Sequence, residues 1–142
     1  AYPGGLCEHA LIVAHELGVL CNAYYPGRYT EEDVIKVALL KDIYKATMYE
    51  VYMKNVKDDA TGQWSTVPAY KTREANARAV FGNAGLSSYM QIKRYVELSD
   101  EQIEAIIHSS PQSFDPDIHE VMRAYPLVTL TRMAEIAATY IN

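Results

Sequence analysis

The sequence predicts an all-α domain, a helical bundle with one inserted β-hairpin at about residues 50–70. Apolar residues recur at helical spacing over most of the chain, and one stretch alternates in the manner of paired strands. The 142 residues, of which 49% are hydrophobic, are enough for one hydrophobic core. We therefore expect a single domain over residues 1–142.

The helices are predicted from the apolar spacing and from the residues at their ends. Thr30 is a typical N-cap, Ser99 with Gln102 forms a capping-box pattern, and Pro126 suits the first turn of a helix. The expected helices cover residues 6–23, 30–48, 85–96, 99–108, 117–124 and 126–141. The inward face of the last one is expected to carry Leu127, Leu130, Ala134, Ala138 and Ile141.

The hairpin is predicted from two runs rich in β-branched and aromatic residues. Residues 51–56 and 64–67 flank a loop that contains Gly62, and Pro68 marks an edge position. We expect this hairpin, with Trp64, to lie as a surface flap packed on the core.

Composition excludes several classes of function. The net charge of −5 argues against a broad nucleic-acid surface, which needs a basic patch. No apolar run reaches the roughly 18 residues of a membrane span, so no membrane partner is expected. Cys7 and Cys21 would lie about 21 Å apart on one helix, too far for a disulfide, which indicates free thiols and a cytoplasmic location.

The stretch over residues 37–45 is the most informative part of the chain. It is apolar on nearly every side of the expected helix, yet Lys41 and Asp42 stand next to each other inside it. Lys and Asp are rarely buried unless they are paired. The pair is therefore predicted to lie either at the mouth of a polar pocket or along a solvent-exposed edge of the helix.

Five segments together resemble the HD-domain metal-dependent phosphohydrolases, in particular the small single-domain type of bacteria and their phages. The most specific of them is the Val-Lys-Asp-x-x-Thr-Gly-x-Trp pattern of residues 56–64. The resembling segments are residues 1–9, 37–45, 56–64, 81–83 and 125–141. The resemblance implies a helical segment upstream of Ala1.

The resemblance also implies a metal site, which this sequence keeps in part. The family's first His corresponds to His9, and the Asp of its His-Asp pair to Asp42, but Lys41 replaces the His of that pair. Glu135 replaces the family's distant Asp. Asn83 and Arg132 replace two auxiliary histidines, Lys45 matches a family lysine, and His108 lies near a further histidine position.

These departures predict that catalysis has been lost. A protonated lysine has no lone pair, so Lys41 cannot ligate a metal, and Arg132 cannot either. We expect the two cations to neutralise Asp42 and Glu135 in place of a metal. No cofactor is expected. A divalent metal would be bound, by His9, Asp42 and Glu135, only if hydrolysis persists.

The predicted function is a catalytically degenerate HD-domain protein, a pseudoenzyme that serves as a binding or interaction module. Its former metal pocket would bind a nucleotide or another phosphate anion, or the module would bind a protein partner. Two alternatives stay open: a residual metal-dependent phosphohydrolase acting on nucleotides, and a purely structural or partner-binding domain. Without the resemblance, His9 would be interpreted as a histidine at the core margin and Lys45 as a solvated lysine.

Overall fold

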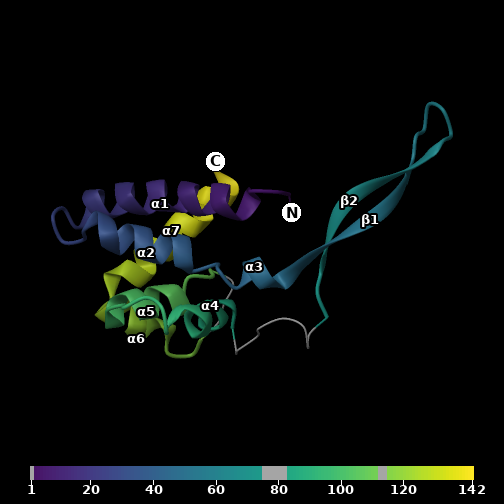
Figure 1. Ribbon diagram of the computed structural model, residues 1–142. Helices are drawn as coiled ribbons and strands as arrows, with labels where there is room; N and C mark the ends of the chain where they lie inside the picture. Colours follow the sequence, from purple (N-terminus) through teal and green to yellow (C-terminus); the bar gives the residue numbers. More distant parts are fainter. Residues whose placement is uncertain (1, 75–82, 112–114) are drawn as a thin grey trace.

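The computed structural model describes residues 2–74, 83–111 and 115–142. Figure 1 shows a body of helices from which a β-hairpin projects. The elements are α1 (Gly5–Tyr24), α2 (Glu31–Leu40), α3 (Lys45–Met48), β1 (Tyr49–Lys57), β2 (Trp64–Thr72), α4 (Ala84–Ile92), α5 (Asp100–Ile107), α6 (Ile118–Ala124) and α7 (Pro126–Tyr140).

The expected fold class, an all-α bundle, is wrong. Of the described residues, 56% are helical, and two strands form an antiparallel sheet, so the protein combines helices with a sheet. The hairpin itself lies where it was predicted, but its strands of nine residues each pair along their whole length, from Tyr49 opposite Thr72 to Lys57 opposite Trp64. An alternating pattern over nine residues forms an extended ladder, which is more than a small insertion into a bundle.

The hairpin also does not pack on the core, contrary to expectation. It extends away from the helices, and the short helix α3 lies at its base (Figure 1). Trp64, near its tip, remains 69% exposed. The expected flap is therefore a projecting arm, which we call the arm (residues 49–72).

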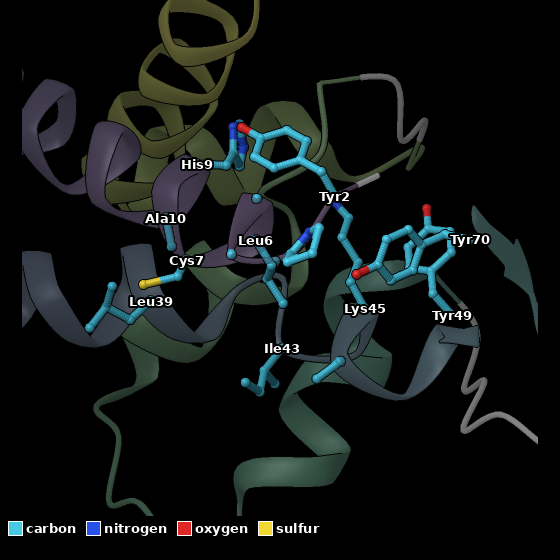
Figure 2. Close-up of a pocket in the computed structure, with 14 residues that line it drawn as sticks. Tyr2, Leu6, Cys7, His9, Ala10, Leu39, Ile43, Lys45, Tyr49 and Tyr70 are labelled. Carbon is cyan, nitrogen blue, oxygen red and sulfur yellow. The ribbon is translucent and has the colours of Figure 1, made fainter. Parts of the chain in front are cut away.

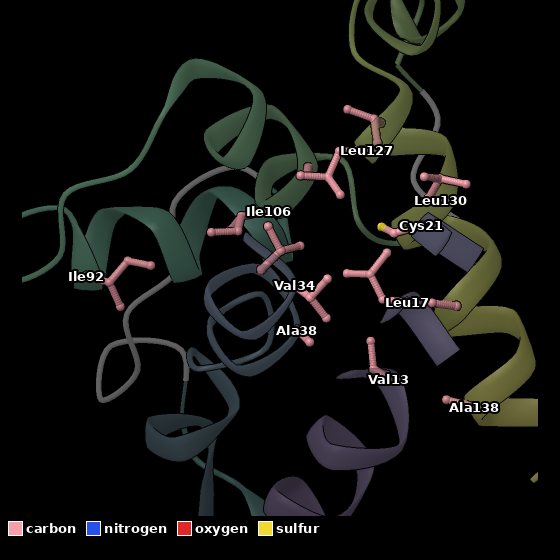
Figure 3. Close-up of a cluster of buried hydrophobic side chains, with 14 of the residues drawn as sticks. Val13, Leu17, Cys21, Val34, Ala38, Ile92, Ile106, Leu127, Leu130 and Ala138 are labelled. Atoms are coloured by element: carbon pink, nitrogen blue, oxygen red, sulfur yellow. The ribbon is translucent and has the colours of Figure 1, made fainter. Parts of the chain in front are cut away.

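The core lies where α1, α2, α5 and α7 meet. Helix α1 packs along α7 and α2, and α5 packs against α4 and α7. Figure 3 shows side chains of this cluster, from α1, α2, α4, α5 and α7, gathered together. The buried cluster includes Val13, Leu17, Cys21, Val34, Ala38, Ile92, Ile106, Leu127, Leu130 and Ala138. Ile141 was expected inside but is 81% exposed, because α7 ends one residue before it.

The predicted helix caps are confirmed. The Thr30 hydroxyl accepts from the backbone N–H of Asp33 at 3.2 Å, and the Asp33 carboxylate accepts from the Thr30 N–H at 2.8 Å. Ser99 and Gln102 form the same reciprocal pair at the start of α5. The Gln102 side chain also donates to Asp33 at 2.7 Å, so the N-termini of α2 and α5 are joined directly.

The helix expected over residues 30–48 is interrupted. Helix α2 ends at Leu40, and the chain then turns through residues 41–44 before the four-residue α3. Here Ile43 N–H donates to the Leu40 carbonyl at 3.2 Å and Lys45 N–H donates to the Asp42 carbonyl at 2.9 Å. Bonds between residues three apart tighten the backbone relative to an α-helix. This turn carries Lys41 and Asp42 to the position described below.

Helix α4 is held unusually close to the end of α5. A Cβ atom on Gly85 would lie 2.2 Å from the Ile106 carbonyl oxygen and 2.4 Å from that of Ile107. Only glycine fits there. The helix ends at Ile92, earlier than the predicted residue 96.

Two sequence predictions concern the cysteines and membrane-spanning segments. Cys7 is exposed and Cys21 is buried, and both are free thiols, as predicted. Among the described residues, no helix combines the length and the apolar character needed to cross a membrane.

Candidate functional site

The structure brings His9, Lys41, Asp42, Lys45 and Glu135 together, and we call these five residues the ion cluster. His9 comes from the second turn of α1, and Glu135 comes from α7, which packs along α1. Lys41 and Asp42 come from the turn after α2 and Lys45 begins α3. Three segments far apart in the sequence therefore converge because α1 packs against both α2 and α7.

Lys41 is the centre of the ion cluster. Its side chain is 1% exposed, and its ammonium group donates to Asp42 Oδ2 and lies 2.5 Å from Glu135 Oε2. A lysine is tolerated at such depth only when its charge is paired and its donors are used. The ammonium is thus a built-in cation held between two carboxylates.

His9 and Lys45 complete the ion cluster from two sides. His9 Nε2 lies 3.0 Å from Glu135 Oε2 and 3.9 Å from Asp42 Oδ2. Lys45 Nζ lies 3.0 Å from the other Asp42 oxygen, Oδ1. Both oxygens of Asp42 therefore face a lysine.

The electrostatics of Asp42 follow from these contacts. Burial by itself would raise the pKa of this carboxyl, because it disfavours the charged form. The positive charges of Lys41 and Lys45, together with their hydrogen bonds, outweigh burial and hold the pKa of Asp42 below its ordinary value. The two lysines balance the charges of Asp42 and Glu135, which is the condition for keeping ions inside a protein.

A divalent metal does not fit this arrangement. One ligand atom each from His9, Asp42 and Glu135 lie within 4.8 Å of one another, which by itself would suit a metal with one imidazole and two carboxylates. However, the Lys41 ammonium already contacts both carboxylates, and it would repel a second cation placed between them. The donor set is compatible with a metal, and the position of Lys41 is not.

Two other predicted site residues, Asn83 and His108, lie outside the ion cluster. The Asn83 side chain accepts from the Leu86 N–H at 2.8 Å and caps α4. His108 is buried, with Nε2 3.1 Å from Glu104 and Nδ1 3.7 Å from Asp115. Phe81 and Gly82, which precede Asn83 in the resembling segment, lie outside the described residues.

The expected role of Arg132 is wrong. Its guanidinium donates to the backbone carbonyls of His108 at 2.9 Å and Pro111 at 3.0 Å, and so ties the segment after α5 to α7. Among the ion pairs of the described residues, none joins Arg132 to Asp42 or Glu135. Lys41, which was expected to share this role with Arg132, reaches both carboxylates, and the second cation is Lys45, which contacts Asp42.

A cavity of about 790 Å³ lies beside the ion cluster, and we call it the N-terminal cavity. Its walls are mostly apolar and aromatic, and Figure 2 shows His9 and Lys45 among the polar side chains around it. Its lining consists of Tyr2, Pro3, Gly4, Gly5, Leu6, Cys7, His9, Ala10, Leu39, Ile43, Lys45, Ala46, Tyr49 and Tyr70. Sequence reasoning missed this cavity, although the abundance of tyrosine signalled half-buried rings with accessible hydroxyls.

No protein-family model, no curated protein and no solved structure matches this chain. The function is therefore inferred from the geometry of the ion cluster and of the N-terminal cavity beside it.

Proposed function

We propose that this protein is a catalytically degenerate HD-like domain that works as an interaction module rather than as a hydrolase. One observation carries this proposal: the buried Lys41 ammonium bridges Asp42 and Glu135. The resemblance implies that a metal would sit between these two carboxylates. A lysine there satisfies the same charges but supplies no open coordination position and no activated water. The two free thiols suit a reducing compartment, and we place the domain in the cytoplasm.

The charge balance of the site favours a partner that is mainly apolar. Lys41 is enclosed by its carboxylates and Lys45 is engaged with Asp42, so little uncompensated positive charge remains in the ion cluster. The N-terminal cavity next to it presents mostly apolar and aromatic walls. Concave apolar surfaces with a few polar groups are the usual binding sites of proteins.

A second candidate is a nucleotide or another phosphate ligand in the same cavity. It is favoured by Lys45, whose side chain lines the cavity and is 31% exposed, and by the neighbouring rings of Tyr49 and Tyr70. A thermal-shift screen with nucleotides and inorganic phosphate tests it. A ligand at one hundred times its dissociation constant adds about 2.7 kcal/mol to the free energy of unfolding.

A third candidate, residual metal-dependent hydrolysis of nucleotides, is favoured by the proximity of His9, Asp42 and Glu135. Metal analysis of protein purified without chelators, with an Mn²⁺-supplemented assay on nucleotide monophosphates and a generic phosphodiester, separates it from the first. We expect no stoichiometric metal and no turnover. One metal per chain, with turnover abolished by Asp42→Ala, would overturn the proposal.

A sharper experiment removes the internal cation. In Lys41→His an imidazole, which can bind a metal, replaces the ammonium between Asp42 and Glu135. Mn²⁺ should therefore raise the melting temperature of this variant but not that of the wild type. Lys36→His is the matched control, since Lys36 lies on α2 and pairs with Glu32 away from the ion cluster. Activity should stay absent in Lys41→His, because Asn83 and Arg132 still occupy positions of the family's histidines.

A further inference from the structure

Among the described residues, no helix packs extensively on either sheet face of the arm. Strands β1 and β2 make their extensive contacts with each other, and at the base with α3. A hairpin of two strands is marginally stable in water by itself and usually needs a further layer. The arm (Figure 1) therefore presents a surface that a partner could cover.

The register shows which face this is. Tyr49, Val51 and Met53 alternate onto one side of β1, and Tyr70, Pro68 and Trp64 lie on the same side of β2. Val51 and Met53 are each 59% exposed there. We call this side the apolar arm face; its residues are Tyr49, Val51, Met53, Asn55 and Lys57 with Thr72, Tyr70, Pro68, Thr66 and Trp64.

The opposite side of the arm differs in charge. It carries Glu50, Lys54 and Lys71, with Lys71 paired to Glu50 at 3.0 Å, and also the apolar side chains of Tyr52, Val56 and Val67, which are 37–40% exposed. The most exposed apolar side chains of the arm, Val51, Met53 and Trp64, therefore lie on the apolar arm face, whereas most of the charged residues of the arm lie on the opposite side.

The free edges of the arm are less suited to pairing than its face. Pro68 removes a backbone donor from β2, and Lys54 and Lys57 stand on β1. Proline and lysine on edge strands are devices that discourage the addition of another strand. A partner is therefore expected to pack on the apolar arm face.

We propose that the apolar arm face docks on a second copy of this chain across a two-fold axis, with Trp64 of each arm filling the N-terminal cavity of its partner. This inference rests on the proposed role as an interaction module. Tyr49 and Tyr70 belong both to the apolar arm face and to the lining of the cavity, so one apolar surface runs from the arm into the cavity.

The two ends of this surface complement each other. Trp64, opposite Lys57, lies near the tip, about 27 Å from Tyr49 at the base, given roughly 3.4 Å per residue. When two arms meet in antiparallel orientation, the tip of one lies over the base of the other. Trp64 of each arm, the most exposed ring of the arm, then reaches the N-terminal cavity of the other copy, as a two-fold interface requires.

Size and charge agree with this arrangement. The ten residues of the apolar arm face and the fourteen that line the cavity, two of them shared, fall within the roughly 20–30 residues that each partner contributes to a stable interface. Lys57 is the charged residue of the apolar arm face. It would approach the cavity rim, where Glu8 accepts from Tyr2 and where the charge of Lys45 is already paired with Asp42.

The test is the oligomeric state of the full chain by sedimentation over a range of concentrations. The wild type should be a dimer, and Trp64→Ala should weaken dimerisation at least thirtyfold, because a central tryptophan is typically a hot spot. Ala46→Trp, which fills the cavity from its own wall, should do the same. Tyr95→Ala is the matched control: its ring is 84% exposed on the body, and the dimer should be unchanged.

Fluorescence gives a direct second measurement, since Trp64 is the single tryptophan of the chain. Its emission should shift to longer wavelength on dilution, as the ring leaves the partner's cavity, while far-ultraviolet circular dichroism stays unchanged. A monomer at all concentrations with the emission of a solvated indole would overturn the proposal, as would a dimer that Trp64→Ala leaves intact. A monomer stabilised by nucleotides would instead assign the cavity to a phosphate ligand.

These outcomes are independent of the test of the proposed function. The Mn²⁺ response of Lys41→His depends on the ion cluster, which the docking variants leave in place. A monomeric wild type that lacks metal and turnover would refute the dimer and keep the degenerate site. A dimer that hydrolyses nucleotides would keep the docking proposal and refute the degenerate site.

Discussion

Replacement of Lys41 by methionine gives the most direct measure of the internal cation. Methionine keeps a side chain of similar length in a place where Lys41 is 1% exposed, so the variant loses mainly the charge and its hydrogen bonds. Breaking a buried ion pair from one side costs about 3–5 kcal/mol, because the other charge is left uncompensated. Asp42 keeps Lys45 at 3.0 Å and Glu135 keeps His9 at 3.0 Å. The loss should therefore be near the lower end, about 3 kcal/mol.

The assay is urea unfolding with a thermal melt. For a domain of this length, about 3 kcal/mol corresponds to a melting temperature lowered by roughly 10 °C. Lys36→Met is the matched control: Lys36 is half-buried, pairs with the exposed Glu32 and donates to the Glu97 carbonyl at 3.1 Å, so its loss should cost only about 1 kcal/mol.

A compensated variant distinguishes charge from packing. In Lys41→Met/Asp42→Asn/Glu135→Gln both carboxylates are replaced by neutral amides. Most of the free energy of unfolding lost in Lys41→Met should therefore return, to within about 1 kcal/mol of the wild type. The reasoning would be refuted if Lys41→Met cost no more than Lys36→Met, or if neutralising the carboxylates brought no recovery.

Three further outcomes follow from the structure. Gly85→Ala should lower the free energy of unfolding by about 3 kcal/mol or more, measured in urea, because its Cβ would collide with the Ile106 carbonyl. The control Gly18→Ala in α1, whose Cβ would meet its nearest neighbour at 4.0 Å, should be neutral or stabilise by up to about 1 kcal/mol. Equal effects of the two substitutions would argue against the close approach of α4 and α5. Lys41 and Lys45 outweigh burial and hold the pKa of Asp42 below its ordinary value. The contribution of Asp42 to the free energy of unfolding is therefore present above about pH 4 and is lost as the pH falls through the lower pKa of the folded state. Asp42→Asn should flatten the decline in stability of the wild type below about pH 4, and an unchanged slope would contradict this. Arg132→Ala should cost about 1.5–3 kcal/mol in chemical unfolding through its two lost carbonyl contacts, and it should leave the Mn²⁺ response unaltered, since Arg132 does not pair with the ion cluster.

Local signals in the sequence were sufficient for most of the secondary structure. Helix caps depend on a side chain and a backbone N–H only three residues apart, so the ends marked by Thr30 and Ser99 could be predicted without tertiary information. The hairpin is similarly local, because its loop fixes the register of the two strands that it joins. The interruption of α2 after Leu40 could not be predicted in this way, since the apolar spacing continues through residues 41–44 although the backbone turns there.

What the sequence by itself determined about the site is its chemistry. A lysine beside an aspartate in an apolar stretch indicated either a polar pocket or a solvent-exposed edge, and the resemblance pointed to His9 and Glu135 as neighbours in such a pocket. Only the tertiary structure decided which cation neutralises the carboxylates. Lys41 reaches both of them, while Arg132, on the same helix as Glu135, turns to carbonyl groups after α5. The position of the arm was likewise decided by tertiary structure, because alternation shows that one side of a strand is apolar but not what covers it. A residue's local pattern fixes its own conformation, whereas its partners depend on how helices distant in sequence pack together.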